Sequence, residues 1–504
     1  MEFDTTKILI CIAIFLFTLY YYLTSTYDYW KSCNVVGPKP IPIFGTIKDY
    51  VFSKYSIGGY LRHVYEQFPN EKMIGIYTGR EPVLLLTDME LIKTMLIRDF
   101  RYFMDRGSGM HEKNEPLTVH LFNLEAKRWG PLRRKLSPVF TGSKLRKMFY
   151  LLLECSEKLD AHIEEINKMP VNVRDVASKF MIDVIGISAF GLHANALSDE
   201  GSEFLDISKR IFSTGWKNII KVRLRNYTPR LFDYIGTFFV DHVITNFFHN
   251  LTRETVAYRK KNISNNHDFI DLLMALRDEP KKADDIELTD KLMAAQLFIF
   301  FVAGFETSSS TTSNCLYELA MNHQVRDKLR EEIREELSKT NGAITYDGIK
   351  NMRYLDKVVH ETLRKYPPVM LIERKTTTPY SFPGTKVSLP VGTHIWIPSF
   401  AIQRDPKYFP NPDVFDPERF SEEAVKSRPQ MAFLSFGQGP RNCIGARFGK
   451  MQVKVALVRI LKSYIVDVCE KTDKSYQLNP KSLLLTPLAG IHLKLIKQPI
   501  ALSQ

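Results

Sequence analysis

One cysteine, Cys443, lies where residue types and spacing point most directly to chemistry. It stands in the segment FGQGPRNCIG, residues 436–445, and an apolar helical pattern follows to about Leu461. A thiol at a helix N-terminus beside a cation is favoured as thiolate by the helix dipole and by free backbone N–H groups. Thiolate binds iron or acts as a nucleophile, whereas the plainer interpretation of a lone cysteine is a buried structural residue.

A second polar segment interrupts another helical pattern, which we expect to begin at the N-cap candidate Thr289. This pattern contains AGFETS at residues 303–308 and a run of five hydroxyl residues at 309–313, and it resumes from Asn314 to Arg330. Glycine, serine and threonine weaken a helix interior. The plain interpretation is a helix end, but the resumed spacing predicts a groove or kink in one long helix.

The cysteine segment fills every fixed position of the haem-binding signature of the cytochrome P-450 family, which this chain resembles. The resemblance implies that Cys443 is the axial thiolate and metal ligand of a haem b iron. Thiolate ligation pushes electron density onto iron and favours cleavage of the O–O bond. The implied cofactor-binding residues are Cys443, Trp129, Arg133, Arg374, Arg441, Phe436, Gly437 and Ala303. The two haem propionates would be bound by Arg133, Arg374 and Arg441, with Trp129. Taken alone, a tryptophan such as Trp129 is more often a residue of the hydrophobic core.

The same resemblance implies that the 303–308 segment crosses the distal face of the haem. There Thr307 would relay protons, with Glu306 as its acidic neighbour, and both are the expected catalytic residues. Glu361 and Arg364 lie at i and i+3 of a helix, a spacing that is most often a surface ion pair. The resemblance instead implies a buried structural network of these two residues with Arg419.

The substrate pocket is the least defined part of the expected site. Its candidate residues, each more often core than pocket, are Phe122, Phe298, Phe301, Phe305, Val369, Met370, Leu371 and Leu485. Aromatic and methionine side chains would suit bulky apolar substrates. Leu231–Val240 is either a second membrane-contacting patch or a buried helix.

Composition narrows the class of protein and its partners. The chain has 504 residues, 25% of them charged, a net charge of +13 and six cysteines without paired spacing. These cysteines indicate a reducing compartment. The basic residues form no concentrated run, so we expect no nucleic-acid binding and favour an acidic protein partner or anionic lipid. The residues expected to dock an electron-donating flavoprotein are Arg128, Arg134, Lys135, Arg447, Lys450 and Lys454.

The N-terminus predicts a membrane anchor. Residues 8–27 carry no charge, and twenty helical residues span about 30 Å, one hydrocarbon core. A cleaved signal peptide is the alternative, but no clear small-x-small cleavage site follows. Lysines after the segment predict a cytosolic body. Trp30 would lie at the membrane interface, and the prolines at 38–42 predict a stiff spacer.

We therefore expect a mainly α fold with a small β region, the cytochrome P-450 fold, preceded by one N-terminal transmembrane helix. The expected organisation is an anchor at 1–30, a Pro-rich hinge at 31–45 and one haem-thiolate catalytic domain at 46–504. Strands are predicted at 73–77, 82–87 and within 374–397, and a hairpin is predicted between Leu483 and Ile496.

The resemblance implies an NADPH-driven monooxygenase of the endoplasmic reticulum membrane. Its electrons would come from NADPH–cytochrome P-450 reductase, with cytochrome b5 as a further partner. Residues 441–452 resemble insect microsomal members that oxidise xenobiotics such as plant toxins or insecticides. The alternatives are a dedicated hydroxylase of an endogenous lipid, hormone or pheromone, a haem-thiolate isomerase that needs no reductase, and a non-catalytic haem sensor.

Overall fold

Helices dominate this computed structural model, which describes residues 5–107, 109–166, 170–198, 201–213, 215–262, 268–279 and 286–501; residues 1–4 of the expected anchor lie outside them. The helices are α1 (Thr5–Thr24), α2 (Tyr29–Ser32), α3 (Lys48–Val51), α4 (Ile57–Gln67), α5 (Met89–Lys93), α6 (Ala126–Leu136), α7 (Gly142–Ile166), α8 (Val173–Ile185), α9 (Glu203–Ile211), α10 (Trp216–Tyr227), α11 (Pro229–Ile235), α12 (His242–Lys261), α13 (Phe269–Asp278), α14 (Asp290–Met321), α15 (His323–Ser338), α16 (Tyr346–Asn351), α17 (Arg353–Lys365), α18 (Ser399–Ile402), α19 (Glu422–Lys426) and α20 (Ala446–Ser463). The strands are β1 (Met73–Thr78), β2 (Glu81–Leu86), β3 (Val171–Asn172), β4 (Ile372–Lys375), β5 (Tyr380–Ser381), β6 (Ser388–Leu389), β7 (His394–Ile397), β8 (Tyr464–Asp467) and β9 (His492–Lys497).

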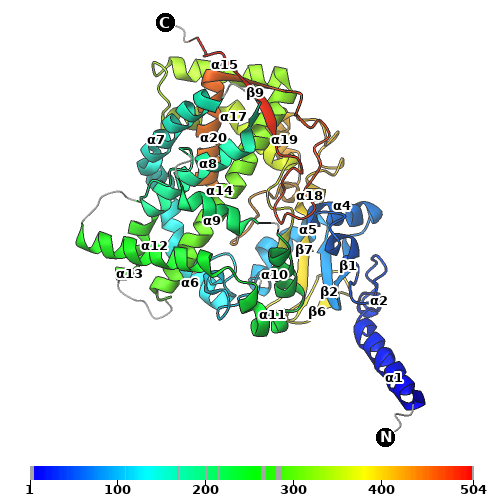
Figure 1. Cartoon of the computed structure of the whole chain (residues 1–504). Coiled ribbons are helices and arrows are strands. Elements are labelled where there is room, and N and C mark those ends of the chain that lie inside the picture. Colours follow the sequence, from blue (N-terminus) through cyan, green and yellow to red (C-terminus); the bar gives the residue numbers. More distant parts are fainter. Residues whose placement is uncertain are drawn as a thin grey trace.

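Helix α14 runs through the centre of the body and packs against α8, α12, α17 and α20 (Figure 1). The Thr289 hydroxyl caps it, as predicted, by accepting from the Leu292 N–H at 3.2 Å. The run of hydroxyl residues does not end the helix, and several of these side chains, like that of Thr307 before them, bond back to the preceding turn. Thr307 donates to the Ala303 carbonyl at 2.7 Å, and Thr311 donates to the Thr307 carbonyl at 2.8 Å.

The main sheet has the strand order β1-β2-β7-β4. β1 and β2 form the predicted antiparallel hairpin, and β7 pairs in parallel with β2. β4 pairs with β7 so that Arg374 lies opposite Ile395, which places this arginine on the sheet's edge strand beside the site. The hairpin predicted between Leu483 and Ile496 is wrong, because β9 pairs instead with β8 and β3, and residues 483–488 hold only the isolated bridge from Leu478 to Pro487.

Helix α1 projects away from the body at the N-terminus (Figure 1). Among the described residues, α1 and α14 are the helices long and apolar enough to cross a membrane, and α14 is mostly buried in the protein whereas α1 is entirely exposed. An apolar helix that is exposed along most of its length is expected to lie in lipid.

The segment after α1 packs against the main sheet at two points. Trp30 is only 2% exposed, and its indole N–H donates to the Ile76 carbonyl at 3.0 Å, so it belongs to the sheet and not to the membrane interface. The Gly75 N–H donates to the Val36 carbonyl at 2.8 Å, which docks the start of the Pro-rich segment beside β1.

Candidate active site

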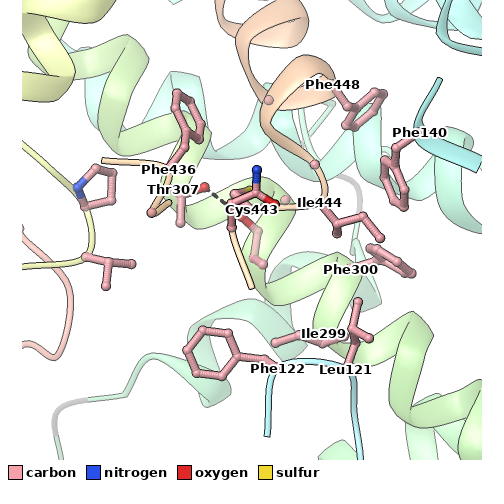
Figure 2. A pocket seen from close by; sticks show the side chains of 18 of the residues that line it. Leu121, Phe122, Phe140, Ile299, Phe300, Thr307, Phe436, Cys443, Ile444 and Phe448 are labelled. Carbon is pink, nitrogen blue, oxygen red and sulfur yellow. Dashed lines mark hydrogen bonds between the residues drawn. The ribbon is translucent and has the colours of Figure 1, made fainter. Parts of the chain in front are cut away.

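Cys443 and Thr307 line one cavity from two different elements (Figure 2). Cys443 lies in the loop that leads into α20, and Thr307 lies on α14. Apolar side chains form much of the wall between them, and they include Leu121, Phe122, Ile299, Phe300, Val369 and Leu371. An apolar cavity with a few convergent polar groups is the usual form of a small-molecule site.

The cysteine loop is held by its own backbone. The Cys443 N–H donates to the Phe436 carbonyl at 2.8 Å, which closes the loop over the intervening residues. Gly439 has a φ of +76°, and a Cβ on it would lie 1.9 Å from the Leu96 carbonyl oxygen. This position therefore requires glycine both for its backbone conformation and for the close approach of Leu96.

Opposing effects act on the pKa of the Cys443 thiol. Burial raises the pKa of the thiol, and the Gly445 N–H and the charges of Arg133 and Arg106 lower it only in part. The desolvation of a charged sulfur outweighs the helix terminus and the cations. A bound metal ion would favour the thiolate, because it deprotonates a coordinating thiol.

Three arginines gather in the same cavity: Arg374 and Arg441 are buried, and Arg106 is half-buried. Burial lowers the pKa of Arg374 well below its usual value, that of Arg106 to about 10 and that of Arg441 to about 9, and the charges of neighbouring arginines lower each further. Among the described residues, Arg374 Nε and Nη2, Arg106 Nε and Arg441 Nε are buried without a hydrogen-bond partner. Such a cluster fits an anionic group with more than one carboxylate, as the two propionates of haem require.

The predicted propionate residues all line this cavity, but the three arginines among them also donate to protein oxygens, Arg374 to the Glu373 carbonyl at 2.8 Å. Trp129 lies beneath the Arg441 guanidinium, 4.5 Å from the ring centre. Arg133 donates to both oxygens of Asn442, and Arg441 donates to the carbonyls of Phe122 and Leu124. Phe436, Gly437 and Ala303 line the cavity as well. Arg106 was missed, because a single arginine in a loop carries no motif.

Thr307 and Glu306, the two expected catalytic residues, point to different places. Thr307 faces the cavity, whereas Glu306 is buried and forms an ion pair with Arg174 of α8. Burial raises the pKa of Glu306, and the charge of Arg174 opposes that rise. The carboxylate is thus held by α8 and not beside the cavity, and Arg174 is a partner that the sequence pattern did not reveal.

The hydroxyl run of α14 also has a structural purpose. Ser310 donates to the Leu485 carbonyl at 3.2 Å, and Tyr476 donates to the Asn314 side chain at 2.5 Å. The Leu485 N–H in turn donates to the Pro368 carbonyl at 2.9 Å. These bonds fix the C-terminal loop against α14 and against the segment that supplies Val369 and Leu371 to the cavity.

The pocket candidates divide into two groups. Phe122, Val369 and Leu371 line the cavity, whereas Phe298, Phe301, Phe305, Met370 and Leu485 are not among its lining residues. Phe301 and Phe305 are almost fully buried, and their rings contact Phe204 of α9 and the neighbouring Phe212. Met370 packs beneath α4, where Gly58 contacts its side chain. Core packing therefore accounts for Phe301, Phe305 and Met370.

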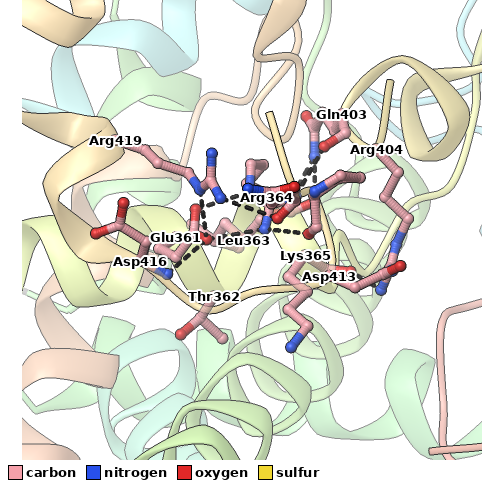
Figure 3. A network of polar contacts seen from close by, with 12 residues as sticks. Glu361, Thr362, Leu363, Arg364, Lys365, Gln403, Arg404, Asp413, Asp416 and Arg419 are labelled. Carbon is pink, nitrogen blue, oxygen red and sulfur yellow. Dashed lines mark hydrogen bonds and ion pairs between the residues drawn. The ribbon is translucent and has the colours of Figure 1, made fainter. Parts of the chain in front are cut away.

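Glu361, Arg364 and Arg419 come together beside the site (Figure 3). Glu361 and Arg364 are fully buried and share two hydrogen bonds, at 2.7 and 2.8 Å, and Arg419 Nε lies 3.5 Å from Glu361 Oε1. Arg364 also donates to the carbonyls of Gln403 and Pro412. The network thus ties α17 to the chain that leads to the cysteine loop.

The six cations expected to dock an electron donor differ in their surroundings. Arg134 and Arg447 are exposed, whereas Lys450 is half-buried and lines the cavity. Arg128 is paired with Glu125, and Lys135 donates to the Leu276 carbonyl. Lys454 is buried and lies 2.9 Å from Asp356, so it is structural. Arg134 and Arg447 are therefore the better candidates for a docking surface.

Comparison with known proteins gives one consistent result. The family model described as Cytochrome P450 matches residues 35–494. Cytochrome P450 6j1 of Blattella germanica is 38% identical over 494 residues, 96% of this chain and 97% of that protein. Cytochrome P450 6B1 of Papilio polyxenes is 37% identical over 494 residues, 95% and 97% of the two chains. Cytochrome P450 6A1 of Musca domestica is 39% identical over 481 residues, 94% of each chain.

Proposed function

Because the chain belongs to the cytochrome P450 family and is a haem-thiolate monooxygenase, we propose that it oxidises apolar foreign compounds with electrons from NADPH. The observation that carries the proposal is the cavity in which the Cys443 sulfur and the Thr307 hydroxyl face a common apolar space. The resemblance to insect family-6 members over nearly the whole chain supports foreign compounds as substrates.

The cavity residues have separable tasks in this reaction. Haem, when bound, supplies the iron chemistry that activates dioxygen, and Cys443 would be its protein ligand. Arg106, Arg374 and Arg441 would bind the carboxylates of the haem, since their buried guanidinium groups are short of partners. Leu121, Phe122 and Ile299 would hold an apolar substrate and exclude water.

Thr307 holds the proton of its hydroxyl on the Ala303 carbonyl, 2.7 Å away. A hydroxyl in this position can accept a proton from solvent and pass one into the cavity by rotation about its Cα–Cβ bond. The balanced reaction takes substrate RH, O2, NADPH and one proton to ROH, NADP+ and water. Proton supply is therefore part of the stoichiometry, and Thr307 is a polar side chain of α14 placed to regulate it.

We place the protein on the endoplasmic reticulum membrane with its body in the cytosol, anchored by α1. A second contact with lipid is supported by α11 and the residues that follow it, where Tyr234 is 87% and Phe238 83% exposed, although Phe232 between Leu231 and Asp233 is buried. The electron donor would be NADPH–cytochrome P450 reductase, with cytochrome b5 as an additional partner. Exposed Arg134 and Arg447 are suited to an acidic surface on either.

The test is reconstitution of the full-length protein with reductase, NADPH and a panel of apolar compounds. The panel holds plant toxins, insecticides and endogenous lipids, and 18O2 is supplied as the oxygen source. Products that carry one 18O atom from several unrelated foreign compounds would support the proposal. Turnover restricted to one endogenous lipid would instead assign a dedicated biosynthetic role, and turnover without reductase would contradict the electron source.

A further inference from the structure

Gln452 of α20 ties helix α14 to the helix that follows Cys443. Its side chain is fully buried, and its Nε2 group donates to the Gly304 carbonyl at 2.8 Å and to the Ser308 hydroxyl. Gly304 and Ser308 stand one helical turn apart and flank Thr307. One side chain, nine residues after Cys443, therefore holds both ends of the turn that carries the Thr307 hydroxyl.

This turn of α14 depends on outside support. The Thr307 hydroxyl bonds back to the Ala303 carbonyl, a contact that tends to bend helices, and glycine at 304 lowers helix stability further. Glycine allows a close approach here, because a Cβ at position 304 would lie 2.4 Å from Ile185 Cδ1 of α8, and that side chain would have to move. Helix α8 thus packs on one side of the turn, and Gln452 bonds to it from the other.

The orientation of the Gln452 amide is fixed by its partner. Gly304 offers a carbonyl, which can only accept, so the NH2 group of Gln452 must face it. The Oε1 atom is then left buried without a partner among the described residues. Leaving a buried acceptor unpaired is unfavourable, so an apolar side chain of similar size would suit this core position better unless the two donated bonds are needed.

We propose that Gln452 is a positioning residue that fixes the Gly304–Ser308 turn of α14 and so keeps the Thr307 hydroxyl directed into the cavity. Gln452 acts through α14 and not on the substrate. This inference deepens the proposed function. One of its two readouts, the hydrogen peroxide released per NADPH consumed, rests on the proposed function. The second readout, amide hydrogen exchange, does not depend on turnover.

The test compares Gln452→Leu with the wild type in the full-length, haem-loaded protein supplied with reductase and NADPH. We expect hydrogen peroxide released per NADPH consumed to rise several-fold, because a displaced hydroxyl no longer supports proton delivery. Combined with Thr307→Ala, the change should add nothing, since both act on one hydroxyl. Haem content and the red-shifted band of the reduced carbon monoxide complex should match the wild type. Gln452→Met, which keeps the side-chain length, serves if the leucine variant loses haem.

Lys454→Met is the matched control, because Lys454 is a buried polar residue of the same helix that binds Asp356 and the Ile349 carbonyl instead of α14. It should lower the melting temperature and leave the peroxide ratio unchanged. Amide exchange across residues 304–308 should accelerate in Gln452→Leu and not in Lys454→Met. An unchanged peroxide ratio, unchanged exchange, or a full additional rise on top of Thr307→Ala would overturn the inference. If the wild-type protein consumes no NADPH, the proposed function alone is contradicted. The amide hydrogen exchange of residues 304–308 then decides whether Gln452 positions the turn.

Discussion

Arg133 of α6 donates two hydrogen bonds to Asn442, at 3.0 Å to its carbonyl and at 2.9 Å to its side-chain oxygen, across 309 positions of sequence. Asn442 directly precedes Cys443, so α6 braces the cysteine loop. Arg441 makes the opposite connection by donating to the Phe122 and Leu124 carbonyls. The cysteine loop and the segment before α6 therefore fix one another.

Replacing the cysteine ligand tests the centre of the site. Cys443→Ser should abolish the red-shifted Soret band of the reduced carbon monoxide complex, because a serine oxygen does not replace thiolate as an electron donor to iron. The spectrum of the purified variant measures this directly. Cys33→Ser, at a partly exposed cysteine far from the cavity, should keep the band. Persistence of the band in Cys443→Ser would assign the ligand elsewhere.

The Thr307 hydroxyl is expected to control how electrons are used. Thr307→Ala should retain haem and consume NADPH but release more peroxide and less product, by about 10²-fold in the product channel, the lower range for loss of a general acid–base group. Product, peroxide and NADPH are quantified in the same reaction. Ser309→Ala is the control, because the Ser309 hydroxyl makes a backward bond on the same helix, to the Glu306 carbonyl at 3.1 Å, and does not line the cavity. Unchanged coupling in Thr307→Ala would remove this hydroxyl from proton transfer.

The buried Glu361–Arg364 pair is predicted to be essential for stability. Glu361→Gln leaves two guanidinium groups without their anion in the protein interior, at a cost of about 3–5 kcal/mol in the free energy of unfolding. The control is Glu331→Gln, since Glu331 and Arg334 have the same i,i+3 spacing on an exposed helix face. That change should cost little, because solvent screens the exposed pair. Equal losses in urea unfolding would show that burial of Glu361 is not the cause.

Arg106, which carries no sequence motif, is predicted to bind the haem. Arg106→Leu should lower the haem-to-protein ratio and speed transfer of haem to apomyoglobin, because it removes a buried cation from the cluster around Arg374. The melting temperature of the apoprotein should instead rise, because the variant removes a cation that repels Arg374. Arg101→Leu, at an exposed arginine of the same segment, is the control. Equal haem transfer rates in the two variants would exclude Arg106 from the binding set.

Acid sensitivity should come in part from His120. Burial, with a smaller effect of nearby arginines, lowers the pKa of this histidine from 6.5 to about 3, so the folded protein keeps it neutral. Below pH 6.5 the unfolded chain binds a proton that the folded chain does not, and stability is lost as the pH falls. His120→Phe should reduce the stability loss between pH 7 and pH 5 by roughly 2 kcal/mol. Urea unfolding at both pH values measures this.

The control for that experiment replaces an exposed histidine, His242, with glutamine. An unchanged pH dependence in His120→Phe would mean that His120 is already protonated or already neutral in both states. The phenylalanine fills the same space between the rings of Phe122 and Phe298, so packing is preserved.

Local signals in the sequence predicted the parts of the site that depend on neighbours in the chain. The cap at Thr289 and the hairpin of β1 and β2 need only short-range patterns, and the structure has both. Arg174 and Gln452 escaped prediction because each acts on α14 from a helix more than a hundred residues away.

The aromatic residues of α14 show the same limit. Apolar spacing says that Phe301 and Phe305 are buried, and they are. It does not say whether a buried ring faces a cavity or another helix, since that depends on the chain near α9, whose Phe204 and Phe212 cover these rings. Trp30 was placed at the membrane for a similar reason: its surroundings come from β1 and not from its own segment.

The contacts of Trp30 and its neighbours connect the N-terminal helix rigidly, and not flexibly, to the body of the protein. Directly after α1, Thr26 donates to the Arg80 carbonyl at 2.6 Å, and the Tyr27 carbonyl accepts from Tyr77 at 2.9 Å. Because these bonds join the end of α1 to β1 and to the turn after it, a tilt of α1 in a bilayer would also tilt the sheet and the cavity beside it. A shortened form without α1 should accordingly begin before Thr26. A cut beyond Trp30 would remove not only α1 but also the Trp30 side chain, which packs against the sheet.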